Sequence, residues 1–371
     1  MPLSTRLKRL LVFIVGALVA LEVLSWGVLF ITGDTTPAPL RVYQEMDTTN
    51  HVVKLKPGFT ATLAELQKIE PYYQNPALLK EIEDYRKLDD VKSDGPALQI
   101  NQDGFRGPEI GPIQPGVPRI IINGDNLVFG LPGAPSIADL LQARLKNLGI
   151  TASVINTGVE GYRTTDLIKR VNDYANLKPD LAIVIIGFND YMRAEPAPLE
   201  PWSGFFRLIH RFHQGAFHHA NIQDAQPNDP RIKALANYTP PMAKQLAKLL
   251  QAYRESGTRV IVVTLPMLFD LGQKIPPEAL AKGELPGYLN NPYLLRAINQ
   301  RYNASIRQVA QNQHAILADT SSWIHTFYDP ERFFLSTTQL TPTGQAVLAD
   351  FLADSVYSWT TTEFRQALSP L

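Results

Sequence analysis

Arg119-Ile120-Ile121-Ile122-Asn123 runs directly into Gly124-Asp125-Asn126-Leu127-Val128-Phe129-Gly130, and this stretch decides the fold. The first five residues form a short apolar run typical of buried strands, and the next seven form a tight turn flanked by glycines. Asn126 lies in this turn, directly after the strand. Its amide nitrogen cannot be activated by a neighbouring base as a hydroxyl can.

Similar apolar runs, rich in Val and Ile, recur along the chain and alternate with helical stretches. This alternation predicts an α/β fold in which a doubly wound, parallel, five-stranded sheet is flanked by helices. In such folds ligands bind at the carboxyl ends of the strands. We expect strands over residues 119–123, 153–156, 181–187, 259–265 and 315–318, and helices over 136–148, 164–177, 241–256, 292–311 and 341–358.

The N-terminal segment differs from the rest of the chain. Leu10 to Ile31 is almost uninterrupted apolar sequence, and its length of about twenty residues is enough to cross a hydrocarbon core of roughly 30 Å. Because Arg6, Lys8 and Arg9 precede it, the N-terminus is expected in the cytoplasm and the main domain outside, in the periplasm of a bacterium. A cleaved signal peptide is the alternative, but the run is long and lacks a clean small-x-small cleavage site.

Two features of the sequence indicate a membrane protein partner. Glu22 lies near the middle of the apolar segment, where a carboxyl is costly unless it is protonated or packs against another membrane subunit. The stretch 191–238 interrupts the strand–helix rhythm with an amphipathic insertion around Trp202. We interpret this insertion as a lid, a membrane-surface element or a partner-binding face.

The chain therefore divides into three regions. Residues 1–33 form a cytoplasmic tip and a transmembrane helix, residues 34–118 form a linker and a small N-terminal extension, and residues 119–360 form the main domain with its insertion. The 35 basic and 35 acidic residues give no net charge, which argues against a nucleic-acid partner. Without cysteine the chain has no disulfides, no thiol catalysis and no thiolate metal sites.

The turn at residues 124–130 belongs to a wider pattern. From Ile100 to Ser358 the chain resembles the SGNH/GDSL hydrolase family, especially its membrane-anchored bacterial members. The first family block is a Gly-Asp-Ser turn that carries the nucleophile, and here Asn126 stands in the serine position. The resemblance implies the fold of this family, and esterase or O-acetyltransferase activity on an envelope polysaccharide.

The second and third blocks retain the groups that bind an oxyanion in this family. The second is matched by Asn156-Thr157-Gly158-Val159-Glu160-Gly161-Tyr162, in which Gly158 is the retained glycine. The third is matched by Gly187-Phe188-Asn189-Asp190, in which Asn189 is the retained amide donor. Both donors suit a carbonyl or negatively charged oxygen.

The last block lacks its catalytic pair. In the segment 335–344, Ser336 stands for the family's aspartate and Gln339 for its histidine. A glutamine amide cannot take a proton from a nucleophile near neutral pH, and a serine cannot stabilise an imidazolium. Asn126, Ser336 and Gln339 therefore replace all three catalytic groups of the family, whereas the oxyanion donors are retained.

Other groups are candidates for a rewired site. His325 follows Asp319 near the last expected strand and His314 precedes that strand, but either would need a new nucleophile, for which Thr337 and Thr338 are candidates only in principle. The closely spaced histidines of the insertion suggest a metal site, but no carboxylate pattern supports one; they are His210, His213, His218 and His219.

These observations predict a membrane-anchored, catalytically degenerate member of the family that needs neither a cofactor nor a metal. Its expected role is a structural or accessory subunit of a membrane or envelope complex, or a module that binds a carbohydrate or acyl ligand. An active esterase or O-acetyltransferase is the alternative. Fold does not fix function, and here the site argues against the fold's usual chemistry.

Overall fold

The main domain is built on one parallel sheet, as the sequence predicts. The computed structural model describes residues 5–32, 40–88, 96–192, 203–206, 227–270 and 274–364. In the sheet the strand order is β6-β5-β7-β8-β9, and every neighbouring pair is parallel. The strands are β5 (Arg119–Gly124), β6 (Ser153–Asn156), β7 (Leu181–Ile185), β8 (Arg259–Val263) and β9 (Ile316–Ala318).

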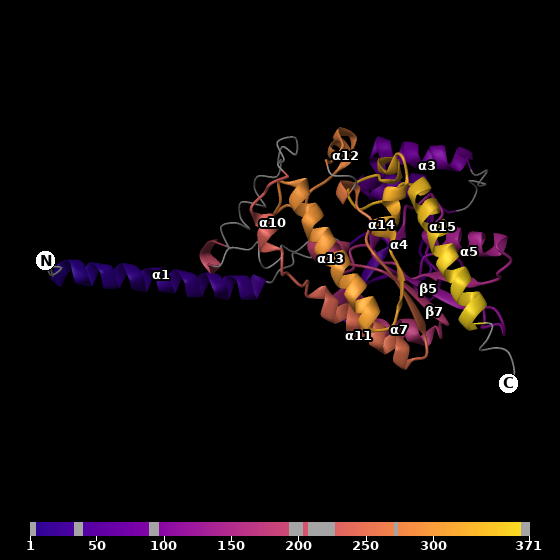
Figure 1. Cartoon of the computed structure of the whole chain (residues 1–371), viewed down its shortest axis with the longest axis horizontal. Helices are drawn as coiled ribbons and strands as arrows, with labels where there is room; N and C mark the ends of the chain where they lie inside the picture. Colours follow the sequence, from indigo (N-terminus) through magenta and orange to yellow (C-terminus); the bar gives the residue numbers. More distant parts are fainter. Residues whose placement is uncertain are drawn as a thin grey trace.

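Helices cover both faces of this sheet (Figure 1). Two of them, α5 and α15, pack together on one face, and α11 packs against α6, α7 and α13 on the other. Right-handed crossovers place α5 on the face opposite α6, α7, α11 and α13, because only the β5–β6 connection runs in the reverse direction along the sheet. Their bounds are α5 (Ile137–Asn147), α6 (Thr164–Lys169), α7 (Val171–Asn176), α11 (Met242–Glu255), α13 (Pro292–Asn312) and α15 (Pro342–Trp359).

Local signals explain where these helices begin and where one is interrupted. The hydroxyl of Ser136 accepts from the N–H of Asp139 and starts α5, while Thr341 caps α15 in the same way. The helix expected over residues 164–177 is instead split into α6 and α7 at Arg170. The guanidinium of Arg170 is nearly buried and pairs with Asp173, an anchor that periodicity does not reveal.

The order of the strands places the loops that follow β5, β6 and β7 next to one another. The chain passes from β5 outward to β6 and then returns across β5 to β7, so the winding reverses beside β5. Ligands bind at such switch points, at the carboxyl ends of the strands. Shorter helices follow several strands, namely α4 (Asn126–Phe129) after β5, α8 (Phe188–Met192) after β7 and α14 (Thr320–Trp323) after β9; α10 (Arg231–Ala234) and α12 (Pro277–Lys282) lie in connections.

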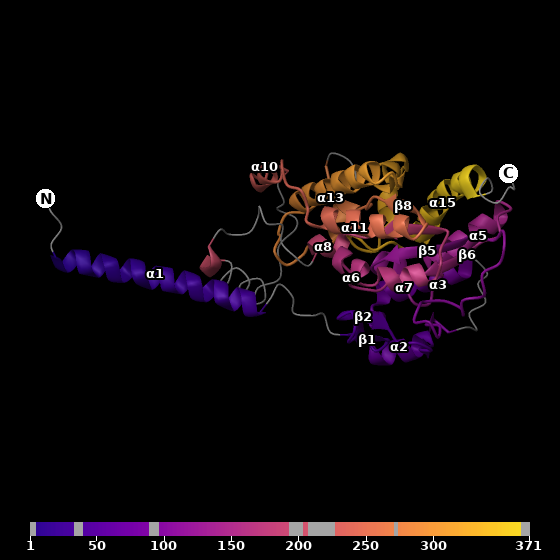
Figure 2. The same ribbon diagram turned by 90° about the horizontal axis from the view of Figure 1, so that it is seen from below.

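A small N-terminal extension lies against the main domain (Figure 2). It contains two short antiparallel pairs, β1 with β2 and β3 with β4, and two helices. Their bounds are β1 (Gln44–Asp47), β2 (Val52–Leu55), β3 (Thr60–Ala61), α2 (Leu63–Ile69), α3 (Pro76–Leu88) and β4 (Leu98–Gln99).

Arg106 ties the segment after the extension to the loop that follows α4. It is 7% exposed, and its guanidinium donates to the carbonyls of Phe129, Leu131 and Ala134. The guanidinium adds a charged donor to three backbone oxygens, of which those of Phe129 and Leu131 accept another bond as well. Arg106 therefore fixes the end of the turn that carries Asn126.

The first helix, α1 (Thr5–Thr32), extends away from the rest of the molecule in both views (Figures 1 and 2). Its described side chains include many exposed apolar residues, such as Val12, Phe13 and Leu18. No helix in the described part of the chain combines the length and the hydrophobicity needed to traverse a bilayer. The transmembrane role of residues 10–31 stays a prediction.

Glu22 of α1 is bonded within the chain. Its carboxylate accepts from the hydroxyl of Ser203 at 2.7 Å and from the N–H of Gly204 at 2.6 Å. Further bonds come from the N–H of Phe205 and the indole of Trp26. The carboxylate in the middle of α1 thus accepts hydrogen bonds from part of the predicted insertion.

Candidate functional site

The turn after β5 places Asn126 at the surface. Asp125 caps α4, since its carboxylate accepts from the N–H of Leu127 at 3.2 Å. A side chain at Gly124 would collide with the carbonyl of Ile185, so only glycine allows β5 and β7 to end this close together. Asp125 is buried while Asn126, the first residue of α4, is exposed at the carboxyl edge of the sheet.

Two hydrogen-bond donors converge on the side-chain oxygen of Asn126. The N–H of Gly161, in the loop after β6, donates to Asn126 Oδ1 at 2.8 Å. Asn189 Nδ2, from α8 after β7, lies 3.3 Å from the same oxygen. A backbone N–H and an amide directed at one oxygen form the arrangement that stabilises an oxyanion in acyl transfer. Here the oxygen between them belongs to the protein itself.

Gly158, the glycine assigned to the oxyanion from the sequence, has another partner. Its N–H donates to Asn156 Oδ1 at 2.9 Å. A side chain at this position would collide with the backbone of Val128 and Phe129, so Gly158 allows the loop to pack under α4. Gly161, the second glycine of the same motif, provides the N–H at Asn126. The only sequence signal for Gly161 was its place three residues after Gly158.

Asn189 lies where the sequence analysis expected an amide donor. Its Nδ2 faces Asn126 Oδ1, Asp125 Oδ2 at 3.2 Å and the carbonyl of Tyr162 at 3.1 Å. The three acceptors surround one NH₂ group and fix its orientation. The structure therefore brings Asn126 and Asn189 into direct contact, with Gly161 as the third member.

Two carboxyls lie beside these amides, Asp125, which is buried, and Asp190, which is half-buried. Burial raises the pKa of Asp125 to about 7, against the bond from the N–H of Leu127, which lowers it. Burial also raises the pKa of Asp190 to about 6, although the N–H and hydroxyl of Thr164 donate to it at 2.9 and 3.0 Å. Desolvation disfavours the charged form of both groups. Asp125 consequently holds its proton to a higher pH than an exposed aspartate does.

The segment with the other two substituted positions forms a bend just before α15. The carbonyl of Gln339 accepts from the N–H of Ser336 at 3.3 Å, and both residues are half-buried. Gln345, in the first turns of α15, donates to the carbonyl of Leu127 at 3.3 Å, so this end of α15 abuts α4. The segment thus approaches the Asn126 turn, but neither of its two substituted positions carries an imidazole or a carboxylate.

Among the alternative groups, Thr337 and Asp319 are bonded elsewhere. The hydroxyl of Thr337 bonds to both the N–H and the carbonyl of Glu284. Asp319 accepts from the guanidinium of Arg307 at 2.9 Å; against the effect of burial, this bond and others lower its pKa to about 2. His325 is exposed in a turn after α14. Trp202 and the four histidines at positions 210, 213, 218 and 219 lie outside the described residues.

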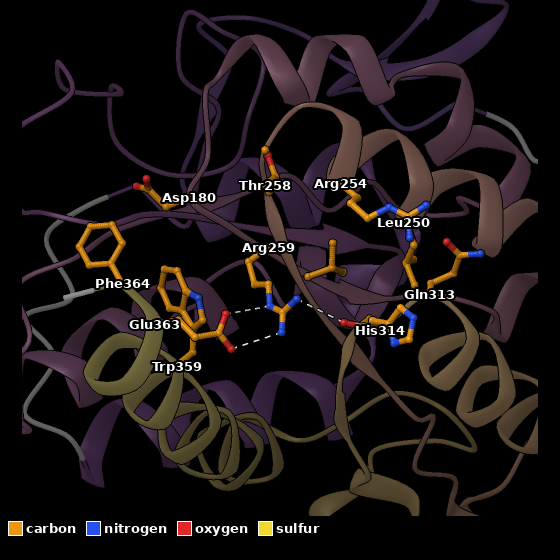
Figure 3. Close-up of a pocket in the computed structure, with 13 residues that line it drawn as sticks. Asp180, Leu250, Arg254, Thr258, Arg259, Gln313, His314, Trp359, Glu363 and Phe364 are labelled. Carbon is orange, nitrogen blue, oxygen red and sulfur yellow. Dashed lines mark hydrogen bonds and ion pairs between the residues drawn. The ribbon is translucent and has the colours of Figure 1, made fainter. Parts of the chain in front are cut away.

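A cavity of about 480 Å³ lies at the opposite edge of the sheet (Figure 3). It is lined at the amino ends of the strands, where Arg259 begins β8 and His314 precedes β9. The Nε of Arg259 pairs with Glu363 at 3.0 Å and its Nη1 donates to the carbonyl of His314 at 3.3 Å. Because ligands of doubly wound folds bind at the carboxyl ends, we place the candidate site at Asn126.

Comparison with known families agrees with the fold and with the position of the turn. Residues 122–347 match the model of the GDSL-like Lipase/Acylhydrolase family, a range that begins inside β5 and ends inside α15. The chain belongs to this GDSL-like family. This match confirms the resemblance to the GDSL hydrolase family, while membrane anchoring and the loss of the catalytic triad stay predictions. A search of curated proteins found no match.

Several solved structures are similar to this GDSL-like chain. The acetyl xylan esterase AlAXEase is 17% identical, with 64% of this chain and 99% of that one covered and a TM-score of 0.42. A lipase/acylhydrolase from Enterococcus faecalis is 16% identical, with 65% and 96% covered and a TM-score of 0.39. The psychrotrophic esterase EstA from Pseudoalteromonas sp. is 16% identical, with 66% and 99% covered and a TM-score of 0.38. The family assignment rests on the match over residues 122–347 and not on these structures.

Proposed function

We propose that this protein is a catalytically inactive GDSL-like hydrolase that serves as a membrane-anchored accessory subunit of an envelope complex. One observation supports the inactivity above all others: the side-chain oxygen of Asn126 sits between the N–H of Gly161 and the amide of Asn189. These two donors are the groups that an acyl substrate would need.

The chemistry of the neighbouring residues supports the same proposal. Asn126 has no proton that a base can remove to give a nucleophile. Gln339 is not a base at neutral pH and Ser336 cannot charge-stabilise one. The nucleophilic attack and the proton transfer therefore each lack the group that they need. The donors that would bind the oxyanion are occupied by Asn126.

A second candidate is a module that binds a carbohydrate or acyl ligand at the same site. The exposure of Asn126 and the retained donors favour it, since a ligand carbonyl could displace the Asn126 oxygen. An active esterase or O-acetyltransferase, the usual activity of the family, has in its favour only the family membership and these donors.

Restoring the missing groups tests the inactivity. The full chain with Asn126→Ser, Ser336→Asp and Gln339→His should gain hydrolysis of p-nitrophenyl acetate, by roughly 100-fold or more over the wild type if general base catalysis returns. The matched control is the single variant Asn126→Ser, which lacks a base and should remain inert. If the triple variant is as inert as the wild type, loss of these three groups does not account for the missing activity.

For the membrane anchor, the basic residues before α1 and the apolar residues along it support a cytoplasmic N-terminus and an external main domain. Because the natural chain has no cysteine, one introduced cysteine reports its own location. Tyr328→Cys, at a position that is 96% exposed, should react with a membrane-impermeant maleimide in intact cells whose outer barrier is opened. Labelling that occurs only after lysis would contradict the proposed topology.

For the accessory role, we propose that a partner contacts the apolar surface of α1 and the insertion. The carboxylate of Glu22 is already bonded to Ser203 and Gly204, so it supports the shape of this surface more than a direct contact with the partner. Mild detergent extraction should yield the chain in a larger assembly. A particle of one chain, unchanged across several detergents, would contradict the accessory role.

A further inference from the structure

Residues of the N-terminal extension contact the loop that contains Gly161. Tyr43 is fully buried, and its ring stacks on Phe129 at the end of α4, with centroids 5.5 Å apart and planes 9° from parallel. Its hydroxyl donates to Glu160 and is 3.2 Å from the hydroxyl of Tyr73. A residue close to the chain's entry into the extension thus contacts both α4 and the residue before Gly161.

Glu160 is held by the extension. Its side chain is 13% exposed, and Arg41 lies 4.0 Å from its carboxylate in addition to Tyr43. Arg41 also pairs with Glu70 at 3.1 Å. Removing one partner of a buried, hydrogen-bonded carboxyl is costly, so these contacts resist displacement.

The backbone of the same residue is held as well. Gln44, which is 6% exposed, donates from Nε2 to the carbonyl of Glu160 at 3.4 Å. This carbonyl belongs to the same planar peptide unit as the N–H of Gly161, so fixing one end of the unit fixes the direction of the other. Gly161 has a φ of 84°. Glycine adopts positive and negative φ about equally readily, so its own conformational preference does not fix the orientation of the Glu160–Gly161 peptide.

The residue after Gly161 is tied down by the extension too. The hydroxyl of Tyr162 donates to the carbonyl of Val53 in β2. The carbonyl of Tyr162 in turn accepts from Asn189. Both sides of Gly161 are therefore fixed by residues that precede the main domain.

We propose that Tyr43 and Gln44 are positioning residues that hold the Glu160–Gly161 peptide so that the Gly161 N–H points at residue 126. The oxyanion arrangement is then not a property of the main domain alone, because it depends on the segment that joins this domain to α1. A displacement of that segment would turn one of the two donors away from the site. The proposal does not depend on whether the protein is active.

The sequence offers a direct way to observe this one N–H. Glu160-Gly161 is the only Glu-Gly pair in the 371 residues. Full-length protein in detergent, labelled with ¹³C-carbonyl glutamate and ¹⁵N-glycine, will therefore give a single carbonyl-linked amide signal, which belongs to Gly161. Its proton shift and its exchange with solvent report the hydrogen bond to Asn126.

Tyr43→Phe and Gln44→Leu are the test variants, and both leave the labelled pair intact. Each should shift the amide proton upfield and make its exchange roughly three- to tenfold faster, as expected for loss of one net hydrogen bond. Tyr253→Phe is the matched control, because it removes another buried tyrosine hydroxyl, the one that donates to Asn123 in β5. It should leave the Gly161 signal in place.

Two results would overturn the proposal. One is a Gly161 signal that neither Tyr43→Phe nor Gln44→Leu changes. The other is an equal change in Tyr253→Phe, which would mean that the amide responds to general loss of stability. If one test variant fails to fold, the other alone decides between these outcomes.

Discussion

At the scale of single residues, the proposed inactivity depends on the position of the side-chain oxygen of Asn126. A serine at the start of α4 would present a hydroxyl, whereas the asparagine presents a carbonyl oxygen that accepts from Gly161 at 2.8 Å. Asn189 adds a second donor and also contacts Asp125. The amides form a neutral network around a buried carboxyl, and such networks are stable when every member has a partner.

The raised pKa of Asp125 predicts a pH-dependent stability. A carboxyl with a higher pKa in the folded than in the unfolded chain binds more protons when folded, so its stabilising effect is complete below the unfolded pKa and is lost as the pH rises through the folded one. For Asp125 this window runs from about 4 to about 7. Relative to Asp125→Asn, the wild type should lose on the order of 1 kcal/mol per pH unit within it. Urea unfolding of both proteins from pH 5 to pH 8 measures this, and parallel stability curves would rule it out.

Arg106 should matter for stability far more than an exposed arginine. In Arg106→Met three carbonyls lose a charged donor, although those of Phe129 and Leu131 keep another donor. We expect this loss to cost about 3 kcal/mol. Arg144, whose ion pair with Asp350 is largely exposed, is the control, and Arg144→Met should cost less than about 1 kcal/mol. Urea midpoints compare the two variants; similar midpoints would show that the Arg106 contacts add little.

At the scale of elements, the contact between α1 and residues 203–206 joins parts of the chain that lie about 180 positions apart. Glu22 supplies the acceptors, and Ser203, Gly204 and Phe205 supply the donors. A side chain at Gly204 would collide with the indole of Trp26, so the close approach requires glycine. The contact fixes this short segment to α1.

Glu22→Leu should release the segment from α1. Spin labels on Leu18→Cys and Phe206→Cys, both at exposed positions, should give one narrow distance distribution with Glu22 present and a broad one with leucine, because three donors lose their acceptor. Glu45→Leu, which removes an exposed carboxylate from the pair with Lys54, is the control and should leave the distribution narrow. Distributions of equal width in all three proteins would argue against the contact.

At the scale of the whole molecule, the sequence predicted the sheet well because parallel strands buried on both faces are short Val- and Ile-rich runs. All five expected strands are present, some shorter by one or two residues, and the turn at 124–130 lies at the switch point. The family match over residues 122–347 agrees with this interpretation.

The contacts that position the site residues could not be predicted from the sequence, because they join segments that lie far apart along the chain. Periodicity cannot show that Tyr43 bonds to Glu160, or that Glu22 bonds to Ser203. The motif containing Gly158 and Gly161 also does not reveal which N–H points at residue 126. That choice follows from how the loop packs under α4, which excludes a side chain at Gly158.

The central claim is that the protein does not hydrolyse esters, because its own Asn126 occupies the oxyanion donors and Gln339 stands where the family has its catalytic histidine. The most direct measurement is hydrolysis of p-nitrophenyl acetate by the full-length wild type, compared with Asn189→Ala, which removes one of the two donors. We predict rates for both proteins that equal the uncatalysed background. Turnover by the wild type that Asn189→Ala abolishes would contradict the account.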